Sequence, residues 1–138
     1  MRTITDGGGG RLAVLVRGSE IKKGLGFYTE EADFLQVGVW AGYERGKVLR
    51  AHNHNQAERT AGRTQEALFV MRGSLRASIY SEDDRFVAAL DVNAGDILVL
   101  FAGGHGYEIT GEDTFVLEVK NGPFPGVEKD KRFLQTGR

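Results

Sequence analysis

The chain has 138 residues, of which 41% are hydrophobic and 27% are charged, and its formal net charge is −1. This length suits one domain with a substantial core, and a nearly neutral chain without a basic stripe gives little support to nucleic-acid binding. Cysteine is absent, which excludes disulfides, a thiol nucleophile and thiolate metal sites. No apolar run approaches ~18 residues and the N-terminus lacks a hydrophobic signal core, so we expect a cytoplasmic protein without membrane contact.

The first half of the chain predicts a loose start and then short strands. Residues 1–11 contain four consecutive glycines and predict a flexible segment, because glycine has a high ordering entropy. Apolar or alternating stretches predict strands over residues 12–16, 24–29, 34–40 and 47–54. Residues 55–65 are polar or small and predict a loop, longer than the usual connection within a compact β domain.

The second half of the chain has a plain β pattern. Strands are predicted over residues 67–72, 75–80, 86–92, 97–101, 107–110 and 115–120, with polar turns at residues 81–85 and 93–96. Short strands without a helical period indicate an all-β barrel or sandwich. The tail, residues 123–138, is expected to pack on it through Phe124, Val127 and Phe133.

The three histidines of the chain lie in two short stretches. His52 and His54 are two residues apart, so in an extended strand they share one face, together with Arg50. Glu66 opens an apolar run, and His105 lies in a second glycine-rich stretch. Imidazoles and a carboxylate that converge are ligands for a divalent metal. The structural alternative is that each histidine is a half-buried polar residue with a hydrogen-bond partner.

These stretches resemble the two motifs of the cupin superfamily. The first motif is matched by Gly46, His52, His54, Glu66 and Gly73, and the second in outline by Gly95, Gly103 and His105. Three features depart from the family pattern: the gap between His54 and Glu66 is longer, Phe101 stands at the proline position, and one residue is missing between Gly103 and His105. The resemblance covers about residues 34 to 120.

The resemblance implies an all-β, cupin-type double-stranded β-helix, that is, a single jelly-roll barrel over residues 12–122. It also implies one divalent metal ion (Zn, Mn, Fe or Ni) with four ligands: His52, His54, Glu66 and His105. Glu58 is an alternative to Glu66, because it lies three residues after His54, where the family spacing places the glutamate. Glu66 is preferred since a strand and Gly73 follow it. Arg50 and Tyr107 are expected to bind substrate, with core packing as the alternative for Tyr107.

Two classes of function agree with this site. One is an enzyme acting on a small polar substrate, first an isomerase or epimerase of a sugar or keto acid and second a dioxygenase. The stretches GHGYEI, residues 104–109, and VKNGPFPG, residues 119–126, resemble bacterial cupins linked to surface-polysaccharide synthesis. Some sugar-nucleotide ketoisomerases of this fold use the His-x-His pair as bases without metal, which the pKa of imidazole permits. The other class is a non-catalytic metal-binding or ligand-binding module.

A homodimer is expected in either class, because the exposed edges of a short open barrel need covering.

Overall fold

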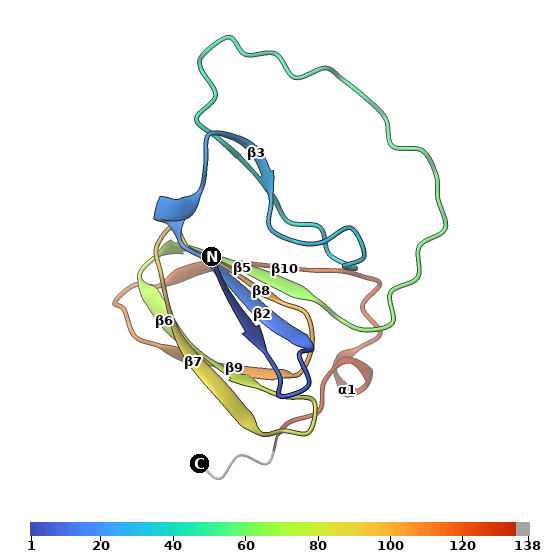
Figure 1. Ribbon diagram of the computed structural model, residues 1–138, viewed down its shortest axis with the longest axis vertical. Helices are drawn as coiled ribbons and strands as arrows, with labels where there is room; N and C mark the ends of the chain where they lie inside the picture. The colour runs from blue at the N-terminus through green and yellow to red at the C-terminus, as the bar shows by residue number, and fades with distance from the viewer. Residues whose placement is uncertain (135–138) are drawn as a thin grey trace.

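The structure, a computed structural model, describes residues 1–134, which form three antiparallel sheets and almost no helix (Figure 1). The five-stranded sheet has the order β1 (Arg2–Thr5), β2 (Arg11–Val16), β8 (Ile97–Leu100), β5 (Glu66–Arg72) and β10 (Phe115–Lys120). The three-stranded sheet has the order β7 (Phe86–Asn93), β6 (Ser74–Tyr80) and β9 (Gly104–Ile109). A hairpin is formed by β3 (Gly24–Phe27) and β4 (Gly38–Ala41). The predicted all-β class is confirmed, while the described residues form separate sheets and no closed barrel.

The main core lies between the two larger sheets, which pack face to face (Figure 1). Because side chains alternate along a strand, every second residue of each strand enters this layer. Leu68 and Val70 of β5 face it from one sheet, and Leu75, Ala77 and Ile79 of β6 face it from the other. All five are at most 2% exposed. The inward face of each strand is therefore fixed by these residues.

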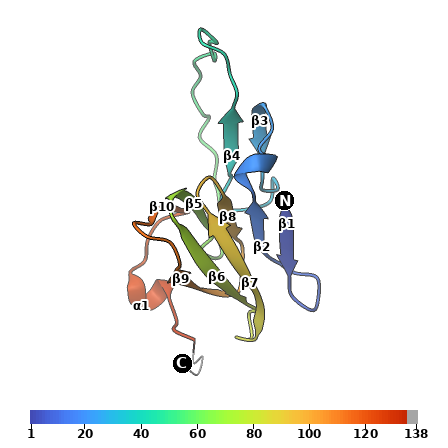
Figure 2. The same ribbon diagram turned by 90° about the vertical axis from the view of Figure 1, so that its left-hand side faces the viewer.

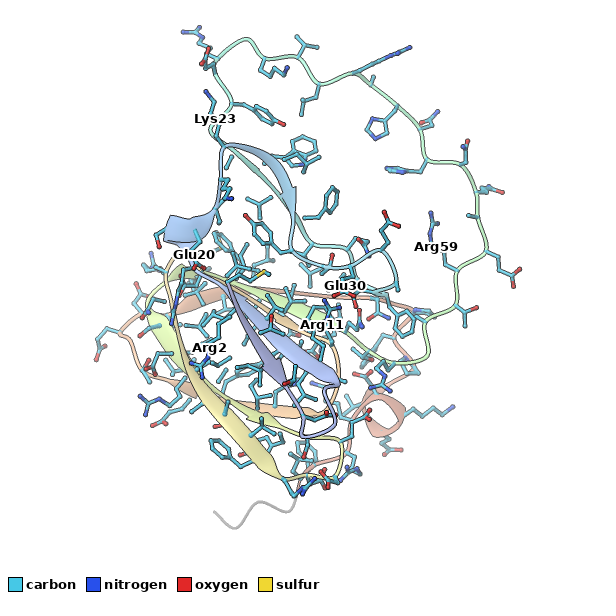
Figure 3. All side chains as sticks on the ribbon, in the orientation of Figure 1. Arg2, Arg11, Glu20, Lys23, Glu30 and Arg59 are labelled. Carbon is cyan, nitrogen blue, oxygen red and sulfur yellow. The ribbon has the colours of Figure 1, made fainter. Side chains whose placement is uncertain are left out.

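The outer face of the five-stranded sheet is also apolar, and it carries a second buried cluster. Val14, Val16, Ala67, Ile97, Val99 and Phe101 form that cluster, and Ile21, Tyr28, Leu35, Val37 and Val39 pack against it. Arg11 holds the covering segment in place: its guanidinium donates to Glu30 at 2.8 Å and lies over the Phe101 ring at 4.0 Å (Figure 3). This covering segment lies over β2 and β8.

Residues 42–63 are all exposed and form neither helix nor strand. Figures 1 and 2 show this segment arching away from the sandwich between β4 and β5. The strand predicted over residues 47–54 is not formed, and the strand predicted from residue 34 begins only at Gly38. Alternation favours an extended backbone, but a strand also needs a partner to satisfy its N–H and C=O groups.

The N-terminus differs from the flexible segment that the glycines predicted. Residues 2–5 form β1, which pairs with β2 and places Ile4 in the core. The carboxylate of Asp6 accepts hydrogen bonds from the N–H groups of Gly8 at 2.9 Å and Gly10 at 2.7 Å. This side chain closes the turn between the two strands, so the glycines serve a hairpin.

The tail touches the sandwich through polar groups. A short helix, α1 (Val127–Asp130), accepts a hydrogen bond from Thr64 at the Asp130 carboxylate, 2.6 Å away, and Arg132 forms an ion pair with Asp84. Phe124, Val127 and Phe133 stay more than half exposed, so the tail does not form the expected apolar packing through them. Residues 135–138 of the predicted tail lie outside the described residues. Residues 1–134 contain no helix long and apolar enough to cross a membrane.

Candidate functional site

Glu66 is a buried carboxylate at the first position of β5. It shares the inward face of Leu68 and Val70, and it is 5% exposed. In the sheet its cross-strand neighbours are Leu100 on β8 and Lys120 on β10. An ionised carboxylate in an apolar layer is costly unless charged or hydrogen-bonding groups surround it. Glu66 has both.

His105 reaches Glu66 from the opposite sheet. It lies on β9, in register with the buried Ile79 of β6, which directs its side chain inward. Its Nε2 lies 3.2 Å from Oε2 of Glu66. The ring of Tyr107, two residues further along the same face, is 5.3 Å from the imidazole between centroids. Two of the four predicted metal ligands, 39 positions apart in the chain, are thus brought into contact.

Lys120 and Glu118 belong to the same cluster, and sequence analysis missed both. Nζ of Lys120 lies 3.0 Å from Oε1 of Glu66 and 3.0 Å from Oε1 of Glu118. The signal was the alternation of β10, which places Glu118 and Lys120 on the face opposite Leu117 and Val119. An apolar stripe is usually assigned to the core, but here it lies on the outer face of the sheet.

These contacts keep Glu66 ionised. The hydrogen bond from His105, opposed by burial and reinforced by Lys120, lowers the pKa of Glu66 from 4.5 to about 2. Hydrogen bonds to Glu118 and Glu66 raise the pKa of Lys120 above its ordinary value. Burial, with the nearby charges of Glu66 and Glu118, raises the pKa of Tyr107, so its phenol remains a hydrogen-bond donor at neutral pH.

The other predicted site residues lie on the exposed segment. The rings of His52 and His54 are 5.1 Å apart, as expected for positions i and i+2, and Nδ1 of His52 lies 3.1 Å from the carbonyl oxygen of Arg50. Glu58 is exposed on the same segment, and Figure 3 shows the neighbouring Arg59 on this arch. Residues 1–134 contain no group of three His, Cys, Asp or Glu side chains placed to hold a metal ion.

A cleft of about 420 Å³ opens beside this cluster. Lys120 lines both, and the other walls come from the end of β10, the tail and the start of β5: Thr64, Asn121, Gly122, Pro123, Phe124, Val127, Asp130 and Lys131. Its volume is in the range of small-molecule sites, and its walls combine apolar side chains with a few polar groups. Lys120 is the member of the Glu66 cluster that lines this cleft.

The four predicted ligands are of the chemical kinds that a divalent metal prefers. Two of them are also close enough to bind the same ion. Glu66 supplies oxygen and His105 nitrogen, and they are adjacent. His52 and His54 are also adjacent to each other, but on a separate segment. No protein-family model matches the chain, and it matches neither a curated protein nor a solved structure.

Proposed function

We propose that this chain is a metal-binding enzyme of the cupin type that acts on a small polar substrate. The contact between Glu66 and His105 carries the proposal, because an ionised carboxylate and an imidazole meet in a buried place next to a cleft. The motifs that predicted these two residues from the sequence support the cupin assignment and its jelly-roll topology. Isomerisation or epimerisation of a sugar or keto acid is the reaction we favour, with dioxygenation second.

The proposed metal ion (Zn, Mn, Fe or Ni) would be held by Glu66 and His105, with His52 and His54 as the further ligands. The latter two can join only if the segment over residues 42–63 folds back onto the sandwich. A divalent metal supplies a Lewis acid that polarises a substrate oxygen. The residues of the chain would position the substrate: Tyr107 would donate a hydrogen bond from its neutral phenol, and Lys120 lies at the wall of the cleft. Arg50 would bind an anionic group once its segment closes.

Metal analysis tests this proposal. The purified protein is dialysed against each of the four metals, and bound metal is measured by mass spectrometry and titration calorimetry. We expect about one equivalent, and a loss of affinity of at least about tenfold in Glu66→Gln, in His105→Ala and in the double variant His52→Ala/His54→Ala. Glu58→Gln is the matched control and should bind normally. A protein that binds none of the four metals would refute the proposal.

A second candidate is a metal-free site, and Lys120 favours it. Its ammonium lies 3.0 Å from Glu66 and so already supplies a positive charge to the carboxylate. The base in this version would be His105, held by Glu66. In the other metal-free alternative, His52 and His54 would be the bases, but both are exposed on the segment over residues 42–63.

Lys120→Met separates the two candidates. If a metal binds, removal of the ammonium frees one carboxylate oxygen, and metal affinity should rise. If the site works without metal, the same variant should bind or turn over its ligand more weakly while metal binding stays negligible. Lys129→Met, at an exposed position of α1, is the control. A thermal-shift screen of sugars, nucleotide sugars and keto acids supplies the ligand, and one that is bound but never converted would favour a non-catalytic module.

A further inference from the structure

The C-terminal segment, residues 121–134, crosses one end of the sandwich from one large sheet to the other. It leaves β10 of the five-stranded sheet directly after Lys120, forms α1, and ends with Leu134 against Gly104, the first residue of β9. A methyl group on Gly104 would lie only 2.7 Å from Cδ1 of Leu134, so these two residues are in close contact. Figures 1 and 2 show α1 at the side of the sandwich. We call residues 121–134 the strap.

The Glu66 cluster lies at this same end of the sandwich. Glu66 is the first residue of β5 and pairs across the sheet with Lys120, the last residue of β10. His105 directly follows Gly104, against which the strap ends. The strap also supplies most of the residues that line the cleft beside Lys120. A segment that begins next to one member of the cluster and ends next to another is placed to control access to it.

The start of the strap is fixed by the side chain of Asn121. Its Oδ1 accepts a hydrogen bond from the backbone N–H of Gln65 at 2.6 Å, and its Nδ2 donates to the carbonyl oxygen of Arg63 at 3.1 Å. Both partners directly precede β5. We therefore expect the strap to stay attached to the sandwich at Asn121.

The rest of the strap is held more loosely. The carboxylate of Asp130 accepts a hydrogen bond from Thr64 at 2.6 Å, and Arg132 forms an ion pair with Asp84 in which the two side chains are 66% and 36% exposed. Exposed ion pairs and single hydrogen bonds add little to stability, because water competes for the same groups. None of residues 121–134 is buried. A segment with so few buried contacts can detach at little cost.

We propose that the strap is a lid that opens about Asn121 and controls access to the Glu66 cluster. The structure shows the closed position, in which Asp130, Arg132 and Leu134 all contact the sandwich. When these contacts release, the cleft loses one wall and the start of β9 opens to solvent. This role rests on the proposed function of the cluster, but the motion itself can be measured without metal or substrate.

Histidine modification by diethyl pyrocarbonate measures the opening. The reagent adds a carbethoxy group to an imidazole nitrogen that solvent can reach, and peptide mass spectrometry gives the rate at each histidine. His52 and His54 are exposed and serve as the internal reference. His105, whose side chain is 28% exposed, should react more slowly than they do in the native protein. In Thr64→Val/Arg132→Ala, which lacks both polar contacts of the distal strap, its rate should rise about threefold or more.

Arg72→Ala is the matched control. It removes another exposed ion pair, with Asp113, at the opposite end of β5, so the reactivity of His105 should stay at the native level. Circular dichroism checks that each variant keeps the fold. Equal reactivity of His105 in the native protein and in the double variant would overturn the proposal. An equal rise in Arg72→Ala would overturn it too, because it would show a general loosening of the sandwich.

A disulfide gives the opposite test, since it holds the strap closed. The chain has no native cysteine, and Gly104→Cys/Leu134→Cys places two thiols where the strap contacts β9. Oxidation should lower the reactivity of His105 below the native level, and reduction should restore it. A disulfide that does not form would show that the strap does not rest on β9. That result, or equal reactivity in the oxidised and reduced forms, would contradict the lid.

The rate of metal uptake separates the lid from the proposed function. If the strap controls access, the disulfide form should take up metal about fivefold more slowly or less, with the same content at equilibrium. Uptake at the native rate would leave the metal site standing and overturn the lid. If no metal binds while the reactivity of His105 changes as expected, the lid stands and the metal site fails.

Discussion

Two carboxylates are buried at opposite ends of the ladder between β5 and β8, and their surroundings differ in kind. Asp96 accepts hydrogen bonds from the backbone N–H groups of Asn93 and Gly18, both at 3.0 Å, and from Arg17 at 2.6 Å. Within residues 1–134, the polar partners of the Glu66 carboxylate are the side chains of His105 and Lys120. Both acidic residues are 5% exposed. Two of the partners of Asp96 are backbone groups that are fixed in position, while those of Glu66 are side chains that can rotate or exchange for a ligand.

The causes of the pKa shifts of Asp96 and Glu66 differ in the same way. Burial raises the pKa of Asp96, but the hydrogen bonds from Asn93, Gly18 and Arg17 outweigh it, and the net shift is downward. For Glu66 the largest influence is the imidazole of His105. Backbone donors that fix a turn indicate a structural carboxylate, and side-chain donors beside a cleft indicate a functional one. Equal burial alone does not separate the two roles.

Asp96→Ala should have the largest effect on stability. It leaves two backbone N–H groups and the Arg17 guanidinium without their acceptor, and a loss of about 3 kcal/mol in the free energy of unfolding is expected. Urea denaturation at neutral pH measures it. Asp96→Asn keeps an acceptor oxygen and should lose roughly half as much. If Asp96→Ala lost less stability than Glu66→Ala, the division between the two carboxylates would be wrong.

Lowering the pH should reveal how much Glu66 contributes to stability, because the pKa of this carboxyl is low. A carboxyl whose pKa falls from 4.5 to about 2 on folding contributes stability above pH 4.5 that is lost as the pH falls toward 2. We expect about 2 kcal/mol from this group, after allowance for screening by solvent. The stability difference between native protein and Glu66→Gln, followed by urea denaturation at successive pH values, should shrink across that window. A constant difference would contradict the ionised, paired state.

Glu58→Gln should have the smallest effect. This third carboxylate lies on the exposed segment, and substitutions at such positions change the free energy of unfolding by less than about 0.5 kcal/mol. Metal content should also be unchanged, because Glu66 is the acidic ligand in our proposal. Thermal denaturation with and without metal measures both quantities. If Glu58→Gln alone lost its bound metal, the acidic ligand would be Glu58 on the exposed segment and not Glu66 in the sandwich.

Most strand positions after residue 66 could be predicted, because alternation and polar turns are local signals, but β9 begins at Gly104 and not at Tyr107, so His105 lies in a strand where the glycines predicted a turn. The strand predicted over residues 47–54 was wrong, since an alternating pattern does not show whether a partner strand is present. The contact of Glu66 with His105 followed a motif spacing, whereas Lys120 was missed. Its position on the inward face of β10 becomes visible only when the apolar stripe of that strand is placed on the outer face of the sheet.

The sequence by itself determined the β class and most of the strand boundaries, because turn residues and side-chain alternation act over short distances. The tertiary structure decided which face of each strand is inside, which side chains neutralise Glu66, and that His52 and His54 lie apart from it. These outcomes depend on sheet order and on contacts between distant segments, and one strand's own residues do not encode the strand that will lie beside it.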